Sequence, residues 1–214
     1  MDDLQRIVDT ICEEFEAKNA VRDETLRRSR QLIRFCANSI RASHRGDFAD
    51  AQTLLTTARA AATKMVTDIQ QYPDLLYAGY TQDALKELAE AHITYALITG
   101  NGFPTPEELD VGPAPYLNGL AEAVGEIRRY LLDRLRQGDV STSERLLAVM
   151  DDIYSLLITV DFPDAITGGL RRQTDMVRGV LERTRGDLTT AVRQEEMKAA
   201  LRAFGRQVGL ANED

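Results

Sequence analysis

The sequence predicts an all-α fold, a single-domain bundle of six to seven helices spanning residues 1–214. Apolar residues recur at helical spacing in nearly every window, and no segment shows the alternation of a half-buried strand. The composition favours helix, because alanine, leucine and arginine abound while only six prolines and no tryptophan occur. A chain of 214 residues, 43% of them hydrophobic, is long enough to bury a substantial core.

Residues that start or stop helices divide the N-terminal half. The first helical region loosens near Asn19 and gives way to a turn in "HRGDF", where Asp47 is a suitable N-cap for the second helix. Pro73 stops that helix, since a residue before proline avoids the helical region. Thr81 is expected to cap the third helix and Gly100 to end it. The predicted helices of this half are residues 3–43, 48–71 and 81–99.

The C-terminal half is divided in the same way. "NGFPTPEELDVGPAP" is the one long irregular stretch and holds a short turn at "PEEL". The fourth helix ends at Gly138, and a Ser-x-x-Glu pattern starting at Ser141 opens the fifth. The last helix is expected to break at "RGD", residues 185–187. The predicted helices of this half are residues 116–137, 141–160 and 170–205.

Several classes of protein are excluded or disfavoured. No apolar run approaches the ~20 residues that cross a bilayer. The N-terminus is acidic and amphipathic without an apolar core, so we expect no secretory signal. Cys12 and Cys36 are too few for a disulfide framework or a zinc site, so we expect reduced thiols, a cytoplasmic location and no membrane association.

The basic residues are distributed unevenly. The formal net charge is −8, which argues against simple non-specific binding to nucleic acid. Arginine nevertheless outnumbers lysine 22 to 4, and seven of these arginines lie within residues 22–45, where Asp23 and Glu24 are the only acids. A basic segment within an acidic protein indicates a binding surface for an anionic partner.

On a helical wheel these arginines form a row. Five of them fall within an arc of about 60° and along about 27 Å of helix. Guanidinium groups bind phosphate oxygens bidentately, so the row suits a nucleic-acid backbone; the alternative is a solvated face that pairs with acids of a neighbouring subunit. No aromatic residues are interleaved, so base stacking is not indicated here. The row consists of Arg27, Arg30, Arg34, Arg41 and Arg45.

Two glutamate pairs form the second candidate site. Glu87 and Glu90 lie one turn apart on the third helix, on a side that we expect to face away from its packed stripe, together with Thr94. Glu122 and Glu126 lie one turn apart on the fourth helix, opposite its apolar stripe. Four converging carboxylates would repel one another unless a hard cation such as Mg²⁺ lay between them. The alternative is that both pairs are ordinary surface residues.

Other catalytic patterns are missing. The sequence contains no glycine-rich phosphate loop, no Ser-His-Asp set and no Glu-x-x-His motif of a di-iron bundle. His44 and His92 are weak ligand candidates, because His92 lies on an apolar stripe. Nucleophilic catalysis therefore has no support, and metal-assisted hydrolysis is the chemistry that the acids favour.

Four segments together resemble the translin family. "YLNGLAEAVGEIRRYLLDRLRQGD" (116–139) is similar to the most specific block of that family, and "RDETLRRSRQLIR" (22–34) is similar to its opening helix. "ALKELAEA" (84–91) resembles the Glu-x-x-Glu stretch of translin-associated factor X, and "RRQTDMVRGVLERTRGDL" fits the closing helices more loosely. The chain is most similar to the factor X type, as a prokaryotic homologue of the component 3 promoter of RISC.

This resemblance implies a seven-helix subunit that assembles into a closed octamer around a cavity. Factor X carries an Mg²⁺-dependent endoribonuclease site, and its acids fall on Glu87, Glu90, Glu122 and Glu126 of this sequence. One departure concerns Glu122, where factor X usually has aspartate, so the carboxylate here reaches one methylene further. Translin lacks acids at the "KELAE" positions, so this chain is similar to the catalytic subunit rather than to its partner.

The leading hypothesis is a homo-oligomeric endoribonuclease that depends on Mg²⁺, with Mn²⁺ as an alternative, and cleaves single-stranded RNA. Single-stranded DNA and tRNA precursors are alternative substrates. A second hypothesis is a non-catalytic single-strand binding protein of translin type, and a third is an all-α nucleoside triphosphate pyrophosphohydrolase. The four glutamates would bind the metal and carry catalysis, and the expected RNA-binding residues are Arg27, Arg30, Arg34, Arg41, Arg128 and Arg129.

Overall fold

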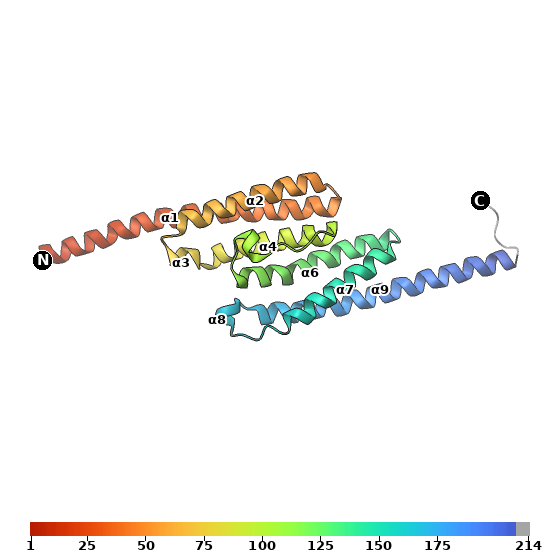
Figure 1. Cartoon of the computed structure of the whole chain (residues 1–214). Helices are drawn as coiled ribbons and strands as arrows, with labels where there is room; N and C mark the ends of the chain where they lie inside the picture. The colour runs from red at the N-terminus through yellow and green to blue at the C-terminus, as the bar shows by residue number, and fades with distance from the viewer. Residues whose placement is uncertain (209–214) are drawn as a thin grey trace.

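A computed structural model describes residues 1–208, which form nine helices and no strand (Figure 1). The predicted all-α fold is confirmed over this range, while residues 209–214 of the predicted 1–214 domain lie outside it. Three helices are single turns, so six long helices build the bundle. The helices are α1 (Asp2–Arg45), α2 (Phe48–Ile69), α3 (Pro73–Leu76), α4 (Gly79–Thr99), α5 (Pro106–Leu109), α6 (Pro113–Arg136), α7 (Val140–Leu157), α8 (Asp164–Thr167) and α9 (Leu170–Gln207).

Helix α4 lies at the centre of the bundle. It packs against α1 and α2 on one side and against α6 on the other, and α6 in turn packs against α7 and α9. Most of the side chains of α4 are consequently buried, including Leu88, Ile93 and Thr94, each 0% exposed. The expectation that Thr94 shares an outward face with Glu87 and Glu90 is therefore wrong, because a central helix has neighbours on more than one side.

The two long terminal helices are continuous where interruptions were predicted. Helix α1 passes through Asn19 without a break, and α9 passes through residues 185–187. A single glycine such as Gly186 costs a helix only about 1 kcal/mol relative to alanine. Packing of the neighbouring Thr184 and Leu188 against the bundle holds α9 helical at this point.

Two of the predicted N-caps were wrong. Thr81 lies inside α4, where its hydroxyl donates to the carbonyl of Leu75. The side chain of Asp139, not that of Ser141, caps α7 by accepting a hydrogen bond from the backbone N–H of Thr142. Asp47 does occupy the N-cap position of α2, although its carboxylate pairs with Arg45 rather than with the helix.

The outer ends of α1 and α9 project from opposite ends of the bundle (Figure 1). Both carry large apolar side chains that are at least two-fifths exposed. No helix within residues 1–208 is long and apolar enough to cross a membrane. The exposed apolar residues of the two projections are Leu4, Ile7, Val8, Ile11 and Phe15 on α1, and Met197, Leu201 and Phe204 on α9 with Val208 directly after it.

Gly119 of α6 sets the contact between α6 and α4. A Cβ atom at this position would lie 2.7 Å from the carbonyl oxygen of Lys86 and 2.9 Å from the backbone nitrogen of Glu90. Only a residue without a side chain allows the two helix backbones to approach this closely. The contact falls at the "KELAE" segment of α4, so it positions the acids of both helices.

We expect Gly119→Ala to destabilise the protein by roughly 1–3 kcal/mol, because the added methyl group must push α6 away from the backbone of α4. Gly125→Ala is the matched control on the same helix, since no atom lies within 4 Å of a Cβ there. That control should be neutral or stabilising by up to about 1 kcal/mol. Denaturant unfolding of the two variants measures the difference, and equal stabilities would contradict the close contact.

Candidate metal centre and arginine face

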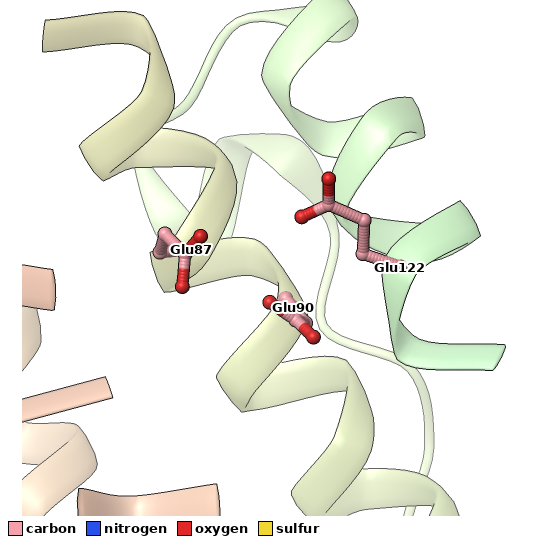
Figure 2. A group of neighbouring side chains, drawn as sticks. All are labelled: Glu87, Glu90 and Glu122. Carbon is pink, nitrogen blue, oxygen red and sulfur yellow. The ribbon is translucent and has the colours of Figure 1, made fainter. Parts of the chain in front are cut away.

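Three of the four predicted acids meet between α4 and α6. Glu87 and Glu90 lie one turn apart on α4, and Glu122 extends toward them from α6 (Figure 2). One carboxylate oxygen from each residue lies within 4.8 Å of the other two. The spacing along α4 and the close approach at Gly119 together produce this three-acid cluster.

Glu90 is the most buried member of the cluster, with 9% of its surface exposed. Burial, reinforced by the negative charges of Glu87, Glu122 and Glu126, raises the pKa of Glu90 to about 8. Burial also raises the pKa of Glu87, although the nearby Lys86 opposes the shift. The cluster therefore favours a positive charge, or a proton, between its carboxyl groups.

Two hydrogen-bond donors hold Glu122. The Nζ of Lys86 and the Nε2 of Gln173 both donate to its Oε1 at 2.8 Å. The same Nζ lies 3.8 Å from a carboxylate oxygen of Glu87. Burial is the largest single influence on the pKa of Lys86 and lowers it, but the hydrogen bond to Glu122 and the negative charges of Glu122, Glu87 and Asp83 together raise the pKa above its ordinary value. Lys86 is thus a cation that compensates part of the charge of the cluster.

Glu126 lies outside the three-acid cluster and has a different partner. Its Oε2 is 2.5 Å from Nε2 of His44, whose side chain is 5% exposed. This hydrogen bond lowers the pKa of Glu126 against the opposing effect of burial. His44 reaches it from α1, so Glu126 ties α1 to α6 one turn below Glu122.

Sequence reasoning missed Lys86, Gln173 and His44 as neighbours of the acids. Lys86 and Gln173 lie 36 and 51 residues from Glu122, and His44 lies 82 residues from Glu126. Contacts over such separations leave no spacing pattern in the sequence. The only available signal was the position of Lys86 within "KELAE", beside Glu87.

The donor set fits a hard divalent cation. Carboxylate oxygens are the ligands that Mg²⁺ and Mn²⁺ take, and these ions need only one or two of them beside waters or phosphate oxygens. Glu90 supplies a physical reason for such an ion, since a buried carboxyl with a pKa of about 8 ionises more easily beside a positive charge. Glu87, Glu90 and Glu122 are the residues that would hold it.

Cys36 of α1 lies behind the cluster and is 0% exposed. Burial raises the pKa of its thiol well above the ordinary value, and the negative charges of Glu87 and Glu90 add to the shift. The thiol therefore stays neutral, which makes it a packing group rather than a metal ligand.

The predicted arginine row lies on the outer side of α1. Its members Arg27, Arg30, Arg34 and Arg41 are exposed, whereas Cys36 and Leu32 on the same helix are fully buried. Arg34 precedes Cys36 by two residues, which turns it about 200° away at about 100° per residue. The arginine row therefore points away from the buried side of α1, where Cys36 lies near Glu87 and Glu90.

Arg128 and Arg129 have different environments. Arg128 donates to the hydroxyl of Thr184 and to the carboxylate of Asp187, both at 2.8 Å, so it links α6 to α9. Arg129 is exposed, and its charge helps to lower the pKa of Glu126. Of the two, Arg129 is the side chain available to an external phosphate.

We expect the raised pKa of Glu90 to reduce stability at high pH. The folded state binds this proton more tightly than the unfolded state, so stability should decline as pH rises from about 4.5 to about 8 in chelator. Glu90→Gln removes this ionisation, and above pH 8 the variant should gain roughly 1–3 kcal/mol relative to the wild type. Thermal unfolding across this range tests it, and parallel curves for the two proteins would refute it.

Comparisons with known proteins found a sequence relative over the whole chain and solved structures of the same fold. No protein-family model matches the chain. An uncharacterized protein of Methanocaldococcus jannaschii, MJ0175, is 30% identical over 214 residues, which are 100% of this chain and 92% of that protein. The solved structure of NeC3PO has a TM-score of 0.78 over 86% of this chain and 96% of its own at 22% identity, which shows the fold alone.

AfC3PO is similar in both sequence and structure. It is 36% identical, with a TM-score of 0.80 over 87% of this chain and 97% of its own, both by itself and in a complex with duplex RNA. C3PO is the component 3 promoter of RISC, the translin-family complex that the sequence resembles. The chain therefore belongs to the translin family as a C3PO-type protein.

Proposed function

We propose that this protein is a metal-dependent endoribonuclease that cleaves single-stranded RNA within a homo-oligomer. The observation that carries the proposal is the three-acid cluster, in which Glu87, Glu90 and Glu122 place carboxylate oxygens within 4.8 Å of one another. Glu90 is buried and Glu87 and Glu122 are half-buried, and burial of a carboxylate costs stability unless a positive charge compensates it. A bound cation would offset this cost by compensating the negative charge of the three acids.

The proposed cofactor is Mg²⁺, with Mn²⁺ as an alternative. When bound, such an ion lowers the pKa of a coordinated water and stabilises negative charge on a phosphodiester. Glu87 and Glu90 from α4 and Glu122 from α6 would hold the ion, and the hydrogen bond from Gln173 keeps Glu122 oriented. Glu126 is proposed as the fourth acid of the catalytic set, held ionised by His44.

RNA as the substrate is supported by a relative and by the arginine face. AfC3PO, at 36% identity, is known in a complex with duplex RNA. The exposed side chains of Arg27, Arg30, Arg34 and Arg41 offer guanidinium groups to phosphate oxygens along one side of α1. Arg129 would add a contact beside Glu126. Specificity for single strands is part of the proposal.

Oligomerisation, proposed as an octamer, would explain two features of the subunit. The projecting ends of α1 and α9 expose apolar side chains that a second copy could cover. The arginine row points away from the buried side of α1 that lies near Glu87 and Glu90, so a shell of several subunits would let one RNA strand contact the arginines of one copy and the acids of another.

A non-catalytic RNA-binding protein is the second candidate, and Lys86 is the observation that favours it. Its ammonium group already lies 2.8 Å from Glu122 and 3.8 Å from Glu87. An acid cluster with an internal counter-charge is stable without a metal ion. The two candidates share RNA binding and differ in metal-dependent cleavage.

Cleavage of an end-labelled single-stranded RNA separates these candidates. We expect the wild type to cut the RNA with Mg²⁺ and to stop cutting with chelator. We expect Glu87→Gln and Glu122→Gln each to lower the cleavage rate at least 100-fold, since each removes the charge of a metal ligand. RNA affinity should stay within about threefold of the wild type. Glu107→Gln, which alters an exposed glutamate of α5, is the matched control and should cut normally.

Wild-type binding without any cutting would establish the non-catalytic candidate. Cutting that survives both cluster variants would show that the three acids are not the catalytic site.

The arginine residues should divide into two functional groups. Arg34→Ala is expected to weaken RNA binding about three- to tenfold and to lower the salt slope by about 1, because it removes one phosphate contact. Its thermal stability should match the wild type.

Arg128→Ala should instead cost roughly 1–2 kcal/mol of stability, since it breaks the link to Thr184 and Asp187. Salt-titrated binding and thermal unfolding measure both effects, and wild-type affinity of Arg34→Ala would contradict the proposed face.

A further inference from the structure

A cavity of about 600 Å³ lies directly beside the three-acid cluster. It is bounded by α4, the first turn of α6, and α8 with the start of α9. Lys86 and Gln173, the two donors to Glu122, belong to its lining. The cavity and the cluster therefore share a wall, and the volume lies in the range of small-ligand sites.

The polar lining of the cavity is rich in hydrogen-bond acceptors. The side-chain amide of Asn118 donates to the carbonyls of Ala114 and Thr167, so its carbonyl oxygen is the group left for a ligand. Gln82 donates to the carbonyl of Leu76 and Gln173 donates to Glu122, and within residues 1–208 neither amide oxygen accepts a hydrogen bond. The carboxylate of Asp83 adds a further acceptor at the rim.

The same lining is poorly suited to a phosphate group. The N-terminus of α6 offers few donors, because Pro113 and Pro115 have no N–H and occupy two of the first three helical positions. Asp83 carries a negative charge, and the one lysine, Lys86, is already bonded to Glu122. An anion would meet the negative charge of Asp83 and, among the described residues of this lining, no cation that is free of a carboxylate.

The walls are apolar and include an aromatic ring at the rim. Tyr77 is 73% exposed and Ile166 is 66% exposed, although both line the cavity. Pro113 and Pro115 contribute further apolar surface. A flat ring that carries N–H donors on its edge matches these walls and this polar lining, and a nucleobase is such a ring.

We propose that this cavity binds a nucleobase, and that it prefers bases with an exocyclic amino group over uracil. Two of the three amide oxygens of Gln82, Asn118 and Gln173 accept from the two N–H groups of the amino group, and the Tyr77 ring stacks on the base. The base belongs to the nucleotide next to the phosphate at the three-acid cluster. This last placement rests on the proposed endoribonuclease function, whereas base binding does not.

Nucleoside binding without metal tests the cavity independently of cleavage. Adenosine, cytidine and uridine are titrated into the protein in chelator, with binding followed by chemical-shift changes. We expect adenosine and cytidine to bind at least threefold more tightly than uridine. Ala165→Trp fills the cavity from an exposed position and should abolish binding, and Tyr77→Ala should weaken it about three- to tenfold.

Ala60→Trp places the same new side chain on the exposed surface of α2, away from the cavity, and should bind nucleosides like the wild type. No binding of any nucleoside, or equal binding by Ala165→Trp, would overturn the proposal. Equal affinity for uridine and adenosine would overturn the preference for amino bases.

A second measurement tests whether the cavity binds the base next to the cleaved phosphate. RNA with a randomised sequence is cut by the wild type and by Ala165→Trp, and the bases on both sides of each cut are counted. We expect an at least threefold depletion of uracil at one flanking position in the wild type and its loss in the variant. Cutting without any flanking bias would overturn the proposed placement. Nucleoside binding without any cutting would instead contradict the endoribonuclease proposal and leave the base pocket standing.

Discussion

The direct backbone contact between α4 and α6 at Gly119 is the constraint on which the candidate site depends. A Cβ atom would lie 2.7 Å from the carbonyl of Lys86, so any other residue would separate the two helices. Separation would move Glu122 away from Glu87 and Glu90 and would lengthen its bond to Lys86. The glycine within "YLNG" is thus part of the site although it bears no functional group.

Much of the fold could be predicted from periodicity and helix-stop residues. Gly100, for example, ends α4 in the left-handed conformation that its position in the sequence indicates. The errors came from tertiary packing: Thr184 and Leu188 hold α9 helical past Gly186, which a local pattern cannot reveal. The cap of α7 shifted to Asp139 because an aspartate two residues earlier competes with Ser141.

The acids of the candidate site could be predicted, but their environment could not. Spacing along one helix places Glu87 beside Glu90, and likeness to a family pairs them with Glu122. Burial of Glu90 depends on α4 being the central helix, which no single-helix pattern encodes. The contacts of His44 with Glu126 and of Gln173 with Glu122 join segments remote in sequence, so they became visible only in three dimensions.

The two thiols of the chain differ in accessibility, so their rates of chemical labelling report on the opening of the candidate site. Cys12 is exposed on the projecting end of α1, whereas Cys36 is buried behind the acids with a raised pKa. A thiol reagent reacts with the thiolate, so it modifies Cys12 at once where no second copy covers the end of α1, and it reaches Cys36 only when α1 lifts from α4. The ratio of the two labelling rates consequently reports how often the candidate site opens, in the unmodified protein and without any engineered probe.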